Sequence, residues 1–79
     1  MLDISDLLDY TQDDCVIDIF DYDLGVNLKE SLSISEARNW AENHSYELGS
    51  FEPIQRDDTE RGHGVVFGIV FNVGNVEEL

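Results

Sequence analysis

Basic residues are almost absent from this chain of 79 residues, which has one lysine and three arginines against 18 aspartates and glutamates. The formal net charge is −14 at pH 7 with neutral histidines. DNA, RNA and anionic membranes would repel such a chain, because they carry negative charge themselves. The composition therefore excludes direct binding to nucleic acid or to these membranes, and it favours a Lys- and Arg-rich protein surface as partner.

Cysteine is also scarce: Cys15 is the only cysteine in the chain. A single cysteine cannot form an internal disulfide, which is typical of proteins of the reducing cytoplasm. Its neighbours Asp13 and Asp14 disfavour a further negative charge, so Cys15 is a poor candidate for a nucleophile. The first ten residues are acidic and lack the basic segment of a secretory signal. We therefore expect a cytoplasmic protein.

Long apolar runs are missing too. The longest, Gly64–Phe71, is far shorter than the roughly 20 residues that cross a bilayer. With 42% hydrophobic residues the chain can still build a packed core, and its length predicts a single domain over residues 1–79. A core of this size leaves little room for an enclosed cleft. Binding through the outer surface therefore suits the chain better than catalysis.

The stretch from Asp13 to Asp23 combines a strand pattern with five acidic residues. Apolar residues alternate within it, which predicts a strand over Cys15–Asp23. Ile17 and Ile19 fall on one face of this strand. The residues that fall on the opposite face are Val16, Asp18, Phe20 and Tyr22.

Weaker elements flank this strand. Leu24-Gly25 predicts a turn and Val26–Glu30 a second strand, so that the two strands form a hairpin. Before the hairpin, the spacing of apolar residues between Leu2 and Leu8 is consistent with a short helix or with a frayed terminus.

The clearest helix begins at Ser33-Ile34-Ser35-Glu36. This is a capping box, in which the side chains of Ser33 and Glu36 each accept a backbone N–H. An apolar stripe at helical spacing follows through Trp40 to His44. We expect the helix to end within Asn43–Ser45 at a residue of left-handed conformation, with His44 at the negative end of the helix dipole.

Two more strands complete the predicted fold. Tyr46–Ile54 predicts a strand with a bulge at Gly49, and Pro53 limits it to a sheet edge or a strand end. A polar loop over Gln55–Gly64, a strand over Val65–Val73 and an acidic tail follow. The sequence therefore predicts an α+β domain of (α)ββαββ order, with a mainly antiparallel four-stranded sheet and one main helix on one face.

The sheet face opposite the helix is expected to be unusually apolar. If the helix covers Ile17, Ile19, Phe67 and Ile69, several large side chains point the other way. These are Val16, Phe20, Tyr22, Val66 and Val70. Three covers for this face are open: the N-terminal helix, a second copy of the chain in a homodimer, or a partner protein.

No catalytic or metal-binding motif is present in the sequence. Asp21 opens a segment similar to a calcium loop, but its glycine is at the fifth position instead of the sixth, and Leu32 occupies the twelfth, where glutamate is needed. One cysteine with His44 and His63 does not supply the four ligands of a zinc site. We therefore predict no cofactor, no metal and no enzyme activity.

The whole chain resembles a class of small phage-encoded inhibitors in its size, its acidity and its ββαββ order. The helix that begins Ser-Ile-Ser-Glu-Ala-Arg-Asn-Trp-Ala at Ser33 is part of this resemblance. The class includes anti-CRISPR and anti-restriction proteins, some of which mimic DNA. The resemblance implies a non-enzymatic inhibitor that blocks a basic nucleic-acid-binding site of a bacterial defence complex. If a phage encodes it, the expected location is the cytoplasm of the host cell.

In such an inhibitor, carboxylates stand in for phosphates and pair with Lys and Arg on the target. The acids expected at the interface come from the first strand and the polar loop: Asp13, Asp14, Asp18, Asp21, Asp23, Asp57, Asp58 and Glu60. Tyr22 is expected to add contact area. Two alternatives fit the same composition. One is an immunity protein or antitoxin that neutralises a basic nuclease, and the other is a halophile-type domain whose acids serve solvation.

Overall fold

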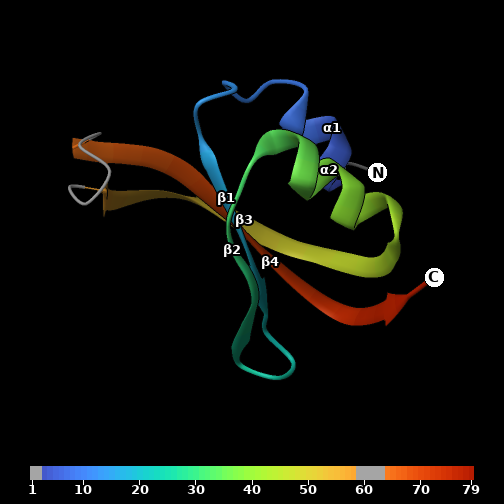
Figure 1. Cartoon of the computed structure of the whole chain (residues 1–79). Helices are drawn as coiled ribbons and strands as arrows, with labels where there is room; N and C mark the ends of the chain where they lie inside the picture. The colour runs from blue at the N-terminus through green and yellow to red at the C-terminus, as the bar shows by residue number, and fades with distance from the viewer. Residues whose placement is uncertain (1–2, 59–63) are drawn as a thin grey trace.

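A computed structural model of the chain describes residues 3–58 and 64–79 (Figure 1). The described residues form two helices and four strands in the order α1, β1, β2, α2, β3, β4, which confirms the α+β class and the predicted order. The elements are α1 Ile4–Leu8, β1 Val16–Asp21, β2 Val26–Leu32, α2 Ile34–Glu42, β3 His44–Asp58 and β4 Gly64–Glu78.

The strands form one sheet in the order β2-β1-β4-β3. The outer pairs β1–β2 and β3–β4 are antiparallel as predicted, but the central pair β1–β4 is parallel. The sheet is therefore mixed, and the prediction of a mainly antiparallel sheet needs this correction. The cause is α2, because a helix that crosses over a sheet joins strands that run in the same direction, here β2 and β3. Their hairpin partners β1 and β4 must then run parallel to each other.

The last two strands are longer than predicted. Residues 55–58 continue β3 and pair with residues 64–67, and residues 74–78 continue β4 instead of forming a tail. The predictions of a loop over Gln55–Gly64 and of a free acidic tail were therefore wrong over these residues. The bulge at Gly49 is confirmed by a register shift between Leu48 and Ser50, and Pro53 lies on the edge strand β3.

Local capping interactions fix both ends of α2. The Ser33 hydroxyl accepts the N–H of Glu36 at 3.1 Å, and the Glu36 carboxylate accepts the N–H of Ser33 at 3.0 Å, which confirms the capping box. These hydrogen bonds lower the pKa of Glu36. At the other end Asn43 has φ −101°, so the predicted left-handed residue is wrong. Instead, Nδ1 of His44 lies 2.7 Å from the carbonyl oxygen of Trp40, in the last turn of the helix.

Both helices lie on the same face of the sheet (Figure 1). The short α1 is capped by Asp3, and the N–H of Ile4 donates to the hydroxyl of Tyr46 at 3.0 Å. The two helices and the sheet share one core, made of Ile4, Leu8, Ile17, Ile19, Ala37, Trp40, Phe71 and Val73. Because α1 packs on this side, it is not the cover of the opposite sheet face.

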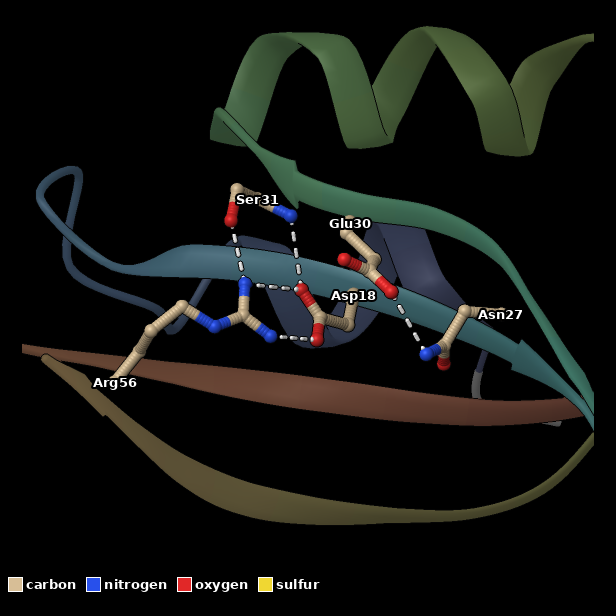
Figure 2. A network of polar contacts seen from close by, with 5 residues as sticks. All are labelled: Asp18, Asn27, Glu30, Ser31 and Arg56. Carbon is tan, nitrogen blue, oxygen red and sulfur yellow. Dashed lines mark hydrogen bonds and ion pairs between the residues drawn. The ribbon is translucent and has the colours of Figure 1, made fainter. Parts of the chain in front are cut away.

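An ion pair lies across that opposite face (Figure 2). Arg56 on the edge strand β3 reaches over β4 and forms two hydrogen bonds with Asp18 on β1. Asp18 also accepts the N–H of Ser31 at 2.9 Å, from a bulged part of β2, and Arg56 donates to the Ser31 hydroxyl. We call this network the Asp18–Arg56 clip. It connects residues of both edge strands of the sheet with β1.

The expected apolar face is half-buried except at Tyr22, which is 45% exposed. Val16, Phe20, Val66 and Val70 are all of intermediate exposure. Asp18 is only 5% exposed. Hydrogen bonding to Asp18 raises the pKa of Arg56 above its already high ordinary value, so the guanidinium remains charged.

We expect the clip to stabilise the fold measurably. Arg56→Met leaves the buried Asp18 carboxylate with only the Ser31 N–H, and the free energy of unfolding should fall by about 1–3 kcal/mol. Arg38→Met is the matched control, because Arg38 pairs with Asp9 at 3.0 Å on the exposed surface. That change should cost less than about 1 kcal/mol. Urea unfolding followed by circular dichroism measures both values.

A double variant separates the ion pair from general packing. Asp18→Leu together with Arg56→Met removes both charges, and it should recover much of the loss caused by Arg56→Met alone. Equal losses for the Arg56 and Arg38 variants would show that the clip has no special role.

Candidate acidic partner-binding surface

The structure separates the predicted site residues into two groups at the two ends of β1. Asp13 and Asp14 precede the strand, and Asp21, Tyr22 and Asp23 end it or follow it. The six residues of β1 span about 20 Å, so the two groups cannot form one compact site. The side chain of Asp58 and the whole of Glu60 lie outside the described residues.

Two of the predicted acids are buried inside the fold. Asp18 belongs to the clip, and Asp21 is only 4% exposed. Oδ1 of Asp21 accepts the N–H of Asp23 at 2.9 Å and of Leu24 at 3.2 Å, and so stabilises the β1–β2 turn. Asp18 lies on the predicted face, but it does not project into solvent there. Both carboxylates stabilise the fold, and neither is presented to a partner.

The β3–β4 hairpin extends beyond both helices (Figure 1). Strand alternation and the pairing of Phe51 with the core residue Phe71 place three exposed apolar residues of this hairpin on the helix side of the sheet. Phe51 and Val65 are each 50% exposed and Phe67 is 64% exposed. We call these three residues the distal patch. The prediction that the helix covers Phe67 was therefore wrong, because the helices are too short to reach it. Phe51 also packs against Phe71 of the core, with ring centroids 6.2 Å apart.

Acidic residues border the distal patch. Asp14 lines a shallow cavity of about 220 Å³ together with Val65 and Phe67, and the other lining residues are Gln12, Cys15 and Val66. Asp13 is adjacent to Asp14 in the chain, and Asp57 lies opposite Val65 in the β3–β4 register. This end of the sheet therefore combines three of the predicted acids with an apolar centre.

At the other end of β1, the ring of Tyr22 lies over two glycines. A Cβ at Gly74 would come within 2.4 Å of Tyr22 Cζ, and one at Gly49 within 2.9 Å of Cε2. Larger residues at these positions would therefore displace the ring. Tyr22 is nevertheless 45% exposed. The backbone of β3 and β4 thus supports an aromatic ring that remains open to solvent.

Two exposed carboxylates accompany this ring. Asp23 accepts the N–H of Asn75 at 2.8 Å, and Glu47 lies opposite Gly74 in the register. Burial raises the pKa of Tyr22, and the negative charges of Glu47, Asp23 and Asp21 raise it further. We call Tyr22, Asp23 and Glu47 the Tyr22 site. Sequence reasoning missed Glu47, because a single glutamate within a strand carries no signal of what lies opposite.

Few cations offset these acids. Arg38 pairs with Asp9 and Arg56 with Asp18, so both are already neutralised within the fold. Among residues 3–58 and 64–79, only Lys29 is a basic residue without an ion-pair partner. Both ends of β1 therefore present an excess of negative charge.

Within the described part of the chain, no group of three or more His, Cys, Asp or Glu residues is arranged to hold a metal ion. Neither described helix is long and apolar enough to cross a membrane. Comparison of the chain with protein-family models, with curated proteins and with solved structures gave no match.

The electrostatics of the Tyr22 site can be tested directly. Glu47→Gln removes a negative charge that disfavours the phenolate, so the pKa of Tyr22 should fall. Glu42→Gln, an equal charge change at the exposed end of α2, should leave it unchanged. A pH titration of the Tyr22 ring ¹³Cζ resonance measures this value. If both variants gave the same pKa as the unaltered chain, Glu47 would not act on the ring.

Proposed function

We propose that this protein is a non-enzymatic inhibitor whose acidic exterior occupies a basic nucleic-acid-binding site on another protein. The resemblance to phage-encoded inhibitors makes a bacterial defence complex the favoured target. One observation carries the proposal: a protein of only 36 × 26 × 19 Å has a net charge of −14. Two of its arginines, Arg38 and Arg56, form ion pairs within the protein.

The magnitude of this charge is comparable to that of DNA. Duplex DNA carries one charge per about 1.7 Å, or roughly 21 charges over the 36 Å long axis of the protein. The protein carries 14 net charges over the same length. A groove that neutralises phosphates would therefore meet a similar density of carboxylates, which accept hydrogen bonds from the same Lys and Arg donors. Solubility alone needs a net charge of only about 2–8.

The distal patch supplies apolar contacts, which charge alone does not provide. Specific interfaces combine an apolar, water-excluding centre with a polar rim, and a few large side chains carry most of the binding energy. Phe51, Val65 and Phe67 provide such a centre, and Asp14 borders it. Charge would speed the encounter with a basic target, and the apolar contacts would slow dissociation.

The net charge also disfavours a homodimer that forms through this surface. Two copies would bring two bodies of −14 together, and their repulsion opposes association. On the sheet face for which a second copy was one of three expected covers, four of the five apolar residues are half-buried. A basic partner protein is therefore the better occupant.

Charge reversal at the distal patch tests the proposal. The unaltered chain is immobilised, a bacterial lysate is applied at low salt, and the captured protein is identified and purified. Asp13→Lys with Asp14→Lys should then weaken binding by about tenfold or more and reduce its salt dependence, because charge-assisted hydrogen bonds contribute roughly 1.5–3 kcal/mol each. Isothermal titration calorimetry at several salt concentrations measures both effects.

Glu77→Lys with Glu78→Lys is the matched control, since it changes the net charge equally at the other end of β4. Equal weakening by both pairs would mean that only the net charge matters. A chain that binds no basic protein, and that unfolds in low salt but refolds in molar salt, would instead fit acids that serve solvation.

A further inference from the structure

The turn that joins β1 to β2 lies on the side of the molecule away from the helices (Figure 1) and carries exposed apolar residues. Tyr22, Leu24 and Val26 are 45%, 70% and 48% exposed. We propose that the Tyr22 site binds the guanidinium group of an arginine side chain on the partner protein. This inference rests on the proposed function, which supplies the basic partner. It deepens that function by naming the chemical group that binds at this end of the molecule.

The ring of Tyr22 is held in a fixed position before any ligand arrives. Gly49 from β3 and Gly74 from β4 each lack the Cβ that would collide with it. The ring therefore lies against the backbone of β3 and β4, and it is still 45% exposed. An aromatic ring fixed in this way loses little conformational entropy when a second planar group stacks on it.

The charges beside the ring select a cation. Glu47 and Asp23 both lie close enough to raise the pKa of Tyr22. Oδ2 of Asp23 accepts the N–H of Asn75, which holds the carboxylate in place and leaves Oδ1 for a ligand. A neutral apolar ligand would desolvate these carboxylates without pairing them, which costs free energy. A cation that covers the ring would pair with them instead.

Guanidinium fits this arrangement better than ammonium does. It is planar, so it can stack on the phenol ring, and its fork of N–H donors can reach a carboxylate at the same time. It is also more weakly hydrated, so covering it costs less. The site should therefore distinguish arginine from lysine, which a diffuse negative surface does not.

Short peptides test this without any knowledge of the natural partner. End-capped tri-arginine, tri-lysine and tri-citrulline are titrated into the complete chain, and the Tyr22 ring resonances are followed by NMR. Tri-arginine should shift the Tyr22 resonances and bind roughly two- to fivefold more tightly than tri-lysine, which is the range that a cation–π contact provides. The neutral tri-citrulline should have no effect.

Variants identify the groups responsible. Tyr22→Leu should abolish the preference for arginine, Tyr22→Phe should keep it, and Glu47→Gln should weaken both charged peptides. The controls are Tyr10→Leu, at a tyrosine that is 90% exposed, and Glu42→Gln, and neither should change binding. The backbone amide spectrum of each variant confirms that it is folded. Tyr22→Phe keeps the test valid if Tyr22→Leu does not fold.

Equal binding of tri-arginine and tri-lysine, with small shifts spread over all acidic residues, would overturn the inference. That result would leave the proposed function intact if Asp13→Lys with Asp14→Lys still weakened the captured partner. Conversely, failure to capture any basic protein would contradict the proposed function, while the peptide titration would still decide whether the Tyr22 site binds guanidinium.

Discussion

The ion pair between Asp18 and Arg56 ties together two strands, β1 and β3, that are not neighbours in the sheet. It joins the edge strand β3 to β1, and through Ser31 to the other edge strand β2, so one network crosses all four strands of the sheet (Figure 2). Of the five apolar residues expected on the sheet face opposite the helices, four are half-buried and only Tyr22 is exposed. The distal patch is the second exposed apolar surface. The proposed function assigns the contacts with a partner to these two surfaces.

The clip also affects how charge is distributed. Arg56 pairs with the buried carboxylate of Asp18, so this cation does not offset the exposed carboxylates, whereas Arg38 pairs with the exposed Asp9. Such a surface repels itself and opposes compaction. Under the proposed function, binding to a basic partner offsets this repulsion. The acidic groups at the two ends of β1 lie about 20 Å apart, a separation that suits a long basic groove better than a small pocket.

Interactions between residues close in the sequence could be predicted, and those between distant residues could not. The capping box of Ser33 and Glu36, the bulge at Gly49 and the edge position of Pro53 each depend on a few neighbouring residues. Alternation shows which residues share a face of a strand but not which strand lies beside it, so the parallel β1–β4 pair was missed. Asp18 looked like the other acids of its stretch, because its partner Arg56 lies 38 residues away. The residues of the candidate site were likewise predicted only in part. Asp13, Asp14, Tyr22 and Asp23 are exposed as expected, whereas Asp21 is buried in its own turn and Glu47 was overlooked.

The central claim is that the carboxylates of this protein take the place of phosphates on a basic target. The most direct measurement is a competition between the protein and a duplex DNA labelled with a fluorophore for the purified captured partner, followed by fluorescence anisotropy. If the two ligands share one site, the apparent Kd of the DNA rises in proportion to the protein concentration and no ternary complex forms. A DNA affinity that stays constant at saturating protein, with both ligands bound to the partner at once, would contradict the claim.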